Sequence, residues 1–278
     1  MPVTIDWDDA YANAAHIPGG ADYPARWQAR ATGFVADLRD ATPGRVEAGL
    51  RYGTDPRECL DLFHPDGPPR GLALFLHGGY WMAFGREDWS HLAAGALARG
   101  WAVAIPSYPL APGADLPGIL AACAAAAGAA GARVPGPIRL AGHSAGAQLA
   151  LRLACADSPL AEPVARRLTG VLAISALADL RPLRHTRMAP ALGLTQLAAA
   201  RAESPALCEP RDGIEVTAWV GAGERPAFLG QTRTIAAVWS GLGCPVRSVE
   251  QPGRHHFDVI DDLARPDSAM VAAFLGED

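Results

Sequence analysis

The sequence predicts an α/β protein in which helices cover both faces of a mostly parallel central sheet. Short, nearly continuous apolar segments alternate with longer amphipathic segments from about residue 46 onward. A strand buried on both faces produces such an apolar run, and regular alternation of strands and helices is typical of a parallel sheet. No internal repeat and no linker-like segment divides the 278 residues, so we expect one domain over residues 1–278.

Each strand is predicted from its apolar pattern. The first two candidates, residues 46–52 and 59–63, alternate apolar and polar side chains as half-buried strands do. Four nearly continuous apolar runs favour central parallel strands: 71–76, 101–105, 138–141 and 171–175. Two further strands are expected in the last third of the chain, at 214–220 and 245–250.

Helices are expected between these strands, over residues 87–99, 115–131, 145–156, 225–241 and 258–275. Two segments lie outside the alternation. Residues 1–45 are polar with scattered aromatic side chains, and they predict an N-terminal helical arm that lies over the main body. Residues 178–212 are rich in Arg, Pro and Ala, and we interpret them as a small cap or lid insertion.

The charged residues exclude several classes of function. All 24 basic side chains are arginine, so the chain has neither a Schiff-base lysine nor the lysine of a P-loop. A net charge of −5 without a basic block argues against nucleic acid or a membrane surface as the main partner. We therefore expect a small-molecule substrate. The absence of lysine also indicates a GC-rich, bacterial genome.

The compartment is predicted from the N-terminus and the cysteines. The first residues include Asp6, Asp8 and Asp9 and hold neither a basic stretch nor an apolar core, unlike a secretory signal. Residues 116–134 are mostly alanine interrupted by glycine, which favours a packed helix over a membrane span. The five cysteines are odd in number and widely spaced, so we expect reduced thiols in a cytoplasmic protein. The sequence has no heptad pattern that would define an oligomeric state, so the question of whether the protein forms a homodimer stays open.

A pentapeptide, Gly142-His143-Ser144-Ala145-Gly146, follows one predicted strand and precedes a predicted helix. This G-x-S-x-G pattern in a strand–turn–helix context is the nucleophile elbow of α/β-hydrolases. The turn is so tight that bulky side chains two positions before and after the serine would clash, and glycine avoids the clash. The helix N-terminus beneath the serine also favours negative charge. We therefore predict an α/β-hydrolase fold with Ser144 as the nucleophile.

A second motif, His77-Gly78-Gly79-Tyr80-Trp81, follows the predicted strand at 71–76. Glycines at this place let main-chain N–H groups turn toward a carbonyl oxygen as it becomes an oxyanion. We predict an oxyanion hole made by the N–H groups of Gly78, Gly79 and Ala145. His77 comes too early in the chain to be the general base, and we expect it to brace the loop.

The general base is expected after the last strand, because the order along an α/β-hydrolase chain is serine, acid, histidine. Of the eight histidines, only His255 and His256 follow the strand candidate at 245–250. We choose His256 as the base and expect His255 to lie in a loop or at the surface.

The acid is expected after the strand at 214–220, where Glu224 is the only carboxylate in the following loop. Its role would be to hold His256 in the correct tautomer and to stabilise the imidazolium. Two alternatives are Asp179, after the preceding strand, and Asp212, before this one.

These motifs together resemble the kynurenine formamidase (arylformamidase) branch of the α/β-hydrolases. The similarity runs from about residue 23 to residue 270, and the segments that carry it are 23–27, 77–81, 142–149, 174–183, 223–228 and 256–258. Tyr80 and Trp81 stand where esterases of the hormone-sensitive lipase type carry a third glycine. Glu224 departs from the branch, which usually has aspartate there, so the choice between Glu224 and Asp179 stays open.

The resemblance implies hydrolysis of N-formyl-L-kynurenine to L-kynurenine and formate. Ser144 would attack the formyl carbon, His256 would take its proton, and water would hydrolyse the formyl-serine intermediate. We expect no metal and no cofactor. The substrate's aryl group predicts an aromatic pocket, for which the candidates are Tyr80, Trp81, Tyr108 and Phe228. Candidate cations for the substrate's carboxylate are Arg184, Arg187 and Arg225.

Three other functions stay open. A carboxylesterase acting on short-chain aryl or alkyl esters would use the same triad, so only pocket shape and substrate competition distinguish it. A non-catalytic, ligand-binding α/β-hydrolase is disfavoured because serine, carboxylate and histidine are all present in order. A metal-dependent amidase would need clustered His and Asp ligands, which the scattered histidines do not favour.

Overall fold

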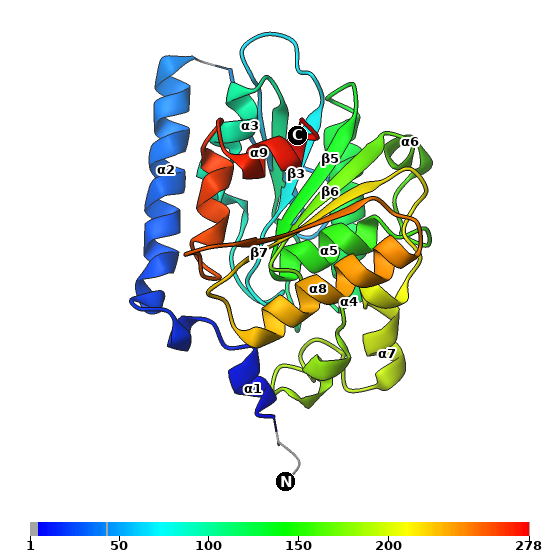
Figure 1. Cartoon of the computed structure of the whole chain (residues 1–278). Coiled ribbons are helices and arrows are strands. Elements are labelled where there is room, and N and C mark those ends of the chain that lie inside the picture. Colours follow the sequence, from blue (N-terminus) through cyan, green and yellow to red (C-terminus); the bar gives the residue numbers. More distant parts are fainter. Residues whose placement is uncertain (1–4, 43, 278) are drawn as a thin grey trace.

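The computed structural model describes residues 5–42 and 44–277. In this part of the chain, eight strands form one sheet in the order β1-β2-β4-β3-β5-β6-β7-β8 (Figure 1). The β1–β2 and β2–β4 pairs are antiparallel, and all other pairs are parallel. The bounds are β1 Val46–Arg51, β2 Cys59–Phe63, β3 Leu72–Leu76, β4 Ala102–Pro106, β5 Ile138–His143, β6 Leu168–Ile174, β7 Glu215–Gly221 and β8 Val246–Gln251. The predicted mostly parallel α/β fold is confirmed.

Helices cover both faces of the sheet (Figure 1). One face carries α4 (Leu116–Gly131), α5 (Ala145–Leu153) and α8 (Pro226–Gly241), and the other carries α2 (Tyr23–Ala41), α3 (Ala94–Ala98) and α9 (Ala269–Leu275). The remaining short α-helices are α1 Trp7–Ala10, α6 Glu162–Ala165 and α7 Leu197–Ala202. The 3₁₀ helices are η1 Ala14–His16, η2 Gly20–Asp22, η3 Arg86–Asp88, η4 Ser90–Ala93, η5 Arg181–His185, η6 Pro205–Leu207 and η7 Val259–Ala264. Among the described residues, no helix is both long enough and apolar enough to cross a membrane.

The side chains of β3 alternate between two hydrophobic cores. Leu72, Leu74 and Leu76 belong to the core on the side of α4, α5 and α8. Ala73 and Phe75 belong to the core on the side of α2, α3 and α9. Successive side chains of a strand point to opposite faces of the sheet. A strand that is covered on both faces must therefore be apolar throughout, which explains the continuous apolar run in the sequence.

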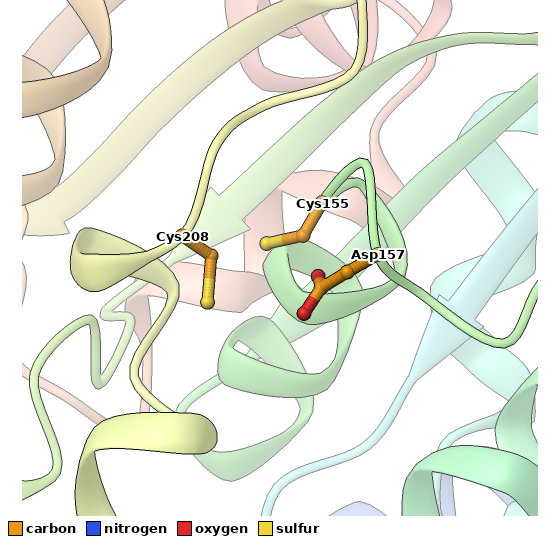
Figure 2. Close-up of side chains that lie close together, drawn as sticks. All are labelled: Cys155, Asp157 and Cys208. Atoms are coloured by element: carbon orange, nitrogen blue, oxygen red, sulfur yellow. The ribbon is translucent and has the colours of Figure 1, made fainter.

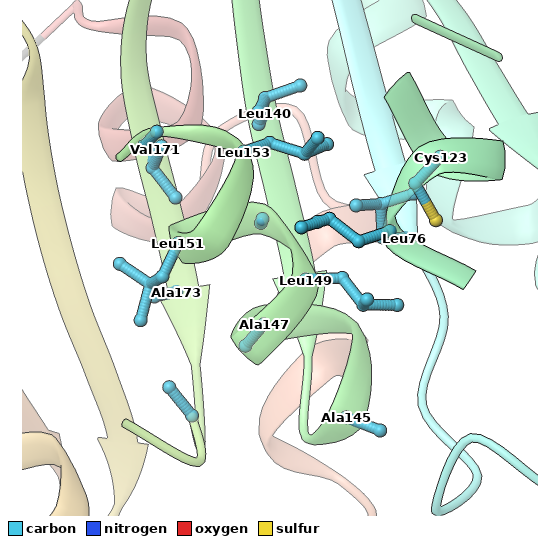
Figure 3. Close-up of a cluster of buried hydrophobic side chains, with 14 of the residues drawn as sticks. Leu76, Cys123, Leu140, Ala145, Ala147, Leu149, Leu151, Leu153, Val171 and Ala173 are labelled. Carbon is cyan, nitrogen blue, oxygen red and sulfur yellow. The ribbon is translucent and has the colours of Figure 1, made fainter. Parts of the chain in front are cut away.

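The helix that follows Ser144 is held firmly in the first of these cores. All nine residues of α5 are buried. Figure 3 shows part of this core, where Leu149 and Leu153 of α5 lie among Leu76 and Leu140 of the sheet. Because close packing resists movement, α5 provides a rigid support for the turn that precedes it.

Two predicted helices are interrupted in the structure. Residues 258–275 form η7 and α9, which are separated by a segment that contains Pro266. Proline disfavours helical geometry at the residue before it, and Arg265 is extended with φ −107° and ψ 112°. Residues 87–99 form η3, η4 and α3, with a break at Trp89 (φ −125°, ψ 2°). Apolar spacing predicts which residues are buried in such segments but not where the helix breaks.

The N-terminal arm packs against the main body through α2. Among the residues of α2, only Trp27 and Ala31 are buried. The ring centroid of Trp27 lies 4.7 Å from that of Trp89, a residue of the chain segment that connects β3 to β4. This aromatic contact joins the arm to the loop that begins at His77.

Candidate active site

Ser144 lies in a strained turn between β5 and α5. β5 ends at His143 and α5 begins at Ala145. Ser144 has φ 57° and ψ −119°, a conformation that non-glycine residues rarely adopt and that is concentrated at functional sites. The turn places the serine at the carboxyl end of the sheet and at the N-terminus of a buried helix.

Both glycines of this turn are required by close backbone contacts. A Cβ atom at Gly142 would lie 2.1 Å from the Gly146 carbonyl oxygen. A Cβ atom at Gly146 would lie 2.0 Å from the carbonyl oxygen of Leu76, the last residue of β3. Gly146 therefore allows α5 to approach the beginning of the His77–Trp81 loop.

We expect Gly146→Ala to destabilise the fold by at least about 2 kcal/mol, because the backbone of β3 would have to move. Gly128→Ala is the matched control, since Gly128 lies inside α4 and a Cβ atom there would meet nothing within 4 Å. The control is expected to stabilise by about 0.5–1 kcal/mol, the helix preference of alanine over glycine. Urea-induced unfolding measures both changes. Equal stability of the two variants would contradict the close contact at Gly146.

His256 and Glu224 form a buried pair. Glu224 Oε2 lies 2.6 Å from His256 Nδ1, and both side chains are almost fully buried. The other carboxylate oxygen, Oε1, accepts hydrogen bonds from Ser175 Oγ at 2.5 Å and from the Gly221 N–H at 2.8 Å. These donors compensate the burial of a negative charge. Because a carboxylate only accepts, Nδ1 is the donor, and Nε2 of the neutral ring is left to accept a proton.

The two alternative acids lie in other surroundings. Asp179 forms an ion pair with Arg181, whose Nη2 lies 2.7 Å from Asp179 Oδ2. Asp212 is exposed in the segment before β7, at the end of the sheet away from Ser144. Of these three carboxylates, Glu224 is the one that contacts His256.

Two neighbouring histidines hold the loop that carries His256. His143 Nε2 donates to the His256 carbonyl oxygen at 2.9 Å. Burial lowers the pKa of His143 well below its usual range, so its ring is neutral. His255 Nε2 lies 3.1 Å from the hydroxyl of Tyr23 in α2. No role is predicted for His143 from the sequence, although its place next to Ser144 in the motif is a signal that it lies at the site.

The predicted oxyanion donors lie beside Ser144. A Cβ atom at Gly78 would lie 3.2 Å from Ser144 Cβ. Gly79 has φ 113°, which favours glycine. Among the described residues, no acceptor takes the N–H of Gly78, Gly79 or Ala145. Free N–H groups next to the serine are what the stabilisation of an oxyanion requires.

His77 and Tyr108 brace this loop. His77 is fully buried and its Nδ1 donates to the Gly78 carbonyl oxygen at 2.8 Å. Burial lowers the pKa of His77 to about 4, so its ring is neutral at pH 7. The Tyr108 hydroxyl donates to the His77 carbonyl oxygen at 2.7 Å, and the two rings stack with centroids 4.3 Å apart. Tyr108 is thus a core residue and not a pocket residue, contrary to the prediction.

A cavity of about 300 Å³ lies at Ser144. Its walls come from the N-terminal arm, from the loop after β3 and from the loops that carry Ser144 and His256. The lining residues are Asn13, Ala14, Gly20, Ala21, Pro24, Trp27, Gly78, Gly79, Tyr80, Ala83, Phe84, Trp89, His143, Ser144, His256 and Phe257. None of these residues, all from the described part of the chain, carries a carboxylate or a guanidinium group.

The predicted aromatic pocket differs from the one in the structure. Tyr80 lines the cavity. Trp81 is fully buried in the core, where its Nε1 donates to Gln148 Oε1 at 3.0 Å. Phe228 is also buried and packs on the ring of His256, with centroids 4.4 Å apart. Both side chains belong to the core on the side of α4, α5 and α8, and neither lines the cavity, contrary to the prediction.

The aromatic walls are instead formed by Trp27, Phe84, Trp89 and Phe257. The arm therefore contributes to the site through α2. The segment 178–212, which the sequence predicts to be a small cap or lid insertion, contributes no lining residue to this cavity within the described part of the chain. It packs against α1, where the ring centroids of Trp7 and His185 lie 6.0 Å apart.

The three candidate cations for a substrate carboxylate are engaged elsewhere. Arg225 and Arg187 form ion pairs with Asp9 and Asp8 of the arm. Arg184 donates to a backbone carbonyl oxygen. None of these arginines lines the described cavity.

Residues 73–258, more than half of the chain, match the model of a protein family described as having the alpha/beta hydrolase fold. The kynurenine formamidase of Danio rerio is 26% identical over 273 residues, which cover 91% of this chain and 92% of the relative. The kynurenine formamidase of Drosophila melanogaster is 27% identical, with 81% and 79% covered.

Solved structures are similar as well. A structure from Silicibacter sp. TM1040, provisionally named a thioesterase, is 45% identical with a TM-score of 0.91, covering 98% of this chain and all of that one (100%). Esterase B of Lactobacillus rhamnosis is 19% identical with a TM-score of 0.66 over 92% of this chain and 93% of its own, which shows the fold alone.

Proposed function

The chain belongs to the α/β-hydrolase family and is a hydrolase similar to the kynurenine formamidases, and from this premise we propose that it cleaves an aryl formamide. The expected substrate is N-formyl-L-kynurenine, and the products are L-kynurenine and formate. The observation that carries the proposal is one cavity lined by both Ser144 and His256, the partner of Glu224, in a chain similar to these enzymes over 91% of its length.

In the proposed first step, the Ser144 oxygen attacks the formyl carbon while His256 Nε2 takes the serine proton. Glu224 orients the ring through Nδ1 and stabilises the imidazolium that forms. The formyl oxygen becomes an oxyanion and accepts hydrogen bonds from the three free N–H groups described above. One such donor contributes about 10²- to 10³-fold to kcat.

In the second step, the C–N bond breaks and His256 donates its proton to the leaving nitrogen. An aryl amine leaves more readily than an alkyl amine, because its lone pair is delocalised into the ring. The remaining formyl-serine is attacked by a water molecule that His256 activates. Formate leaves and Ser144 is restored.

The cavity suits the aryl end of this substrate better than its amino-acid end. Its walls are largely aromatic and aliphatic and hold no carboxylate or guanidinium group among the described residues. Burying an unpaired charge is costly, so the amino and carboxylate groups of N-formyl-L-kynurenine would point toward solvent. Formanilide lacks both charged groups. Because these groups would contribute little binding energy from solvent, less than about 1.4 kcal/mol, formanilide is expected to reach a kcat/KM within about tenfold of that for N-formyl-L-kynurenine.

Esters and thioesters are the second candidate substrate class. The same attack would release an alcohol or a thiol in place of an amine. The provisional thioesterase name of the 45%-identical Silicibacter protein favours including thioesters. Because the triad would serve all three reactions, only direct comparison of substrates distinguishes them.

Steady-state hydrolysis of four substrates tests the proposal: N-formyl-L-kynurenine, formanilide, p-nitrophenyl acetate and a short-chain acyl thioester. The quantity to compare is kcat/KM, since it defines specificity. We expect about 10⁴ M⁻¹s⁻¹ or more on N-formyl-L-kynurenine, well above the ester and the thioester. Ester or thioester turnover with negligible formamide turnover would retain the mechanism and reject the substrate. If none of the four substrates showed turnover that depends on Ser144, a ligand-binding role would be favoured.

A further inference from the structure

Two thiols and a carboxylate meet outside the catalytic site, where the end of α5 lies beside the segment that leads to β7 (Figure 2). Cys155 follows α5, and Cys208 directly follows η6. The Sγ atoms of Cys155 and Cys208 and a carboxylate oxygen of Asp157 all lie within 4.8 Å of one another. The proposed hydrolysis uses none of these three residues.

Main-chain hydrogen bonds hold the two cysteine-bearing segments side by side. The Ala156 N–H donates to the Glu209 carbonyl oxygen at 2.9 Å, and the Arg211 N–H donates to the Ala154 carbonyl oxygen at 2.9 Å. Cys155 itself forms an antiparallel bridge with residue 210. Because the backbones already lie together, rotation of the side chains can bring the sulfurs toward the bond length of a disulfide, about 2.05 Å.

The two thiols differ in exposure and in acidity. Cys155 is fully buried, whereas Cys208 is partly exposed. The hydrogen bond with Cys155 lowers the pKa of Cys208, and the charge of Arg152 acts in the same direction. The same hydrogen bond, together with burial, raises the pKa of Cys155. Since the thiolate is the reactive form, Cys208 is suited to react first and Cys155 to resolve the product.

We propose that Cys208 and Cys155 are a modification site, at which hydrogen peroxide converts the two thiols into an intramolecular disulfide. The Cys208 thiolate attacks one peroxide oxygen, the O–O bond breaks, and a sulfenic acid forms while the other oxygen leaves as water after taking a proton. The Cys155 sulfur then attacks the Cys208 sulfur, and the S–O bond breaks to release a second water. The two thiols lose two electrons and two protons, and one peroxide becomes two waters.

Arg152 argues against a metal ion as the ligand of this cluster. Its Nη1 lies 2.9 Å from Asp157 Oδ1, and its Nε lies 3.6 Å from Glu203 Oε2. The guanidinium thus already pairs with the carboxylate that a metal would need, and its positive charge opposes a divalent cation. Oxidation of the thiol pair needs neither the guanidinium nor the carboxylate as a ligand.

Thiol counting and peptide mapping of the folded, reduced protein test the proposal. Brief exposure to hydrogen peroxide is expected to remove two of the five free thiols, and dithiothreitol is expected to restore them. Trypsin cleaves after arginine, so the non-reduced digest should contain peptide 153–166 joined to peptide 202–211. Mass spectrometry of this pair should find it two hydrogen masses lighter than the sum of the separate peptides.

Serine variants separate the roles of the two cysteines. Cys208→Ser is expected to keep all of its thiols under the same exposure. Cys155→Ser is expected to lose one thiol, as a sulfenic acid on Cys208 that dimedone labels. Cys244→Ser is the matched control, because Cys244 is buried away from the pair and donates to the Ile214 carbonyl oxygen at 3.3 Å. It should still lose two thiols and give the same joined peptides.

Several results would overturn the proposal. The treated protein could retain all five thiols, or the lost thiols could map to Cys59, Cys123 or Cys244. Disulfides that join Cys208 only to a second chain would also exclude the intramolecular pair. Retention of one zinc ion per chain by the reduced protein, lost in both variants of the pair, would assign the cluster to a metal instead.

Discussion

Ser144→Ala is expected to lower kcat/KM for N-formyl-L-kynurenine by at least about 10⁴-fold, because no other nucleophile can form the acyl intermediate. The substitution removes Oγ and keeps Cβ, so the turn at φ 57° need not change. Steady-state hydrolysis at high enzyme concentration measures the residual turnover. The unfolding midpoint of the variant should match that of the unaltered protein.

Ser240→Ala is the matched control for this experiment, because Ser240 is exposed near the end of α8. We expect its kcat/KM to stay within about twofold, as for most surface substitutions. Pre-incubation of the unaltered protein with EDTA is also expected to leave activity unchanged. If Ser144→Ala kept more than about a tenth of kcat/KM, the serine would not be the nucleophile. Loss of activity in EDTA would favour a metal-dependent amidase.

Glu224→Gln is expected to lower kcat by about 10³- to 10⁴-fold with a much smaller change in KM. The carboxylate accepts hydrogen bonds from His256 Nδ1, Ser175 Oγ and the Gly221 N–H. An amide of the same size has one oxygen and cannot serve donors on both sides. If its NH₂ group faces Nδ1, the His256 proton moves to Nε2, where the ring can no longer accept the proton of Ser144.

Asp179→Asn is the matched control for Glu224→Gln, since Asp179 was the competing candidate for the acid. Its carboxylate pairs with Arg181 and makes no contact with His256 in the described structure. We expect kcat to change by less than about threefold. A severe loss in Asp179→Asn, together with near-normal Glu224→Gln, would show that the acid is assigned to the wrong residue.

Local sequence patterns were sufficient to predict the strands and the tight turn at Ser144. β3 is apolar at every position because each of its faces meets a helical layer. The turn at Ser144 depends on residues two positions away on each side, where Gly142 and Gly146 avoid backbone contacts of 2.1 and 2.0 Å. Requirements that involve neighbours in the chain can be recognised in the sequence alone.

Helix boundaries were predicted less well. Pro266 marks a break that the apolar spacing of 258–275 does not reveal, because residues on both sides of the break are buried. The predicted helix at 145–156 ends at Leu153 in the structure. Apolar periodicity depends on the average position of apolar residues along a segment, so it does not locate the end of a helix to within one helical turn.

The sequence by itself determined the fold class, the tight turn at Ser144 and the presence of a carboxylate and a histidine in the expected order. Only the tertiary structure decided which carboxylate meets His256, because Asp179 and Glu224 both follow parallel strands whose carboxyl ends lie at one edge of the sheet. It also decided the cavity walls. Trp81 turns into the core to reach Gln148, whereas Trp27 of the distant arm lines the site. An apolar pattern specifies that an aromatic side chain is buried, but its neighbours depend on how segments far apart in the chain pack together.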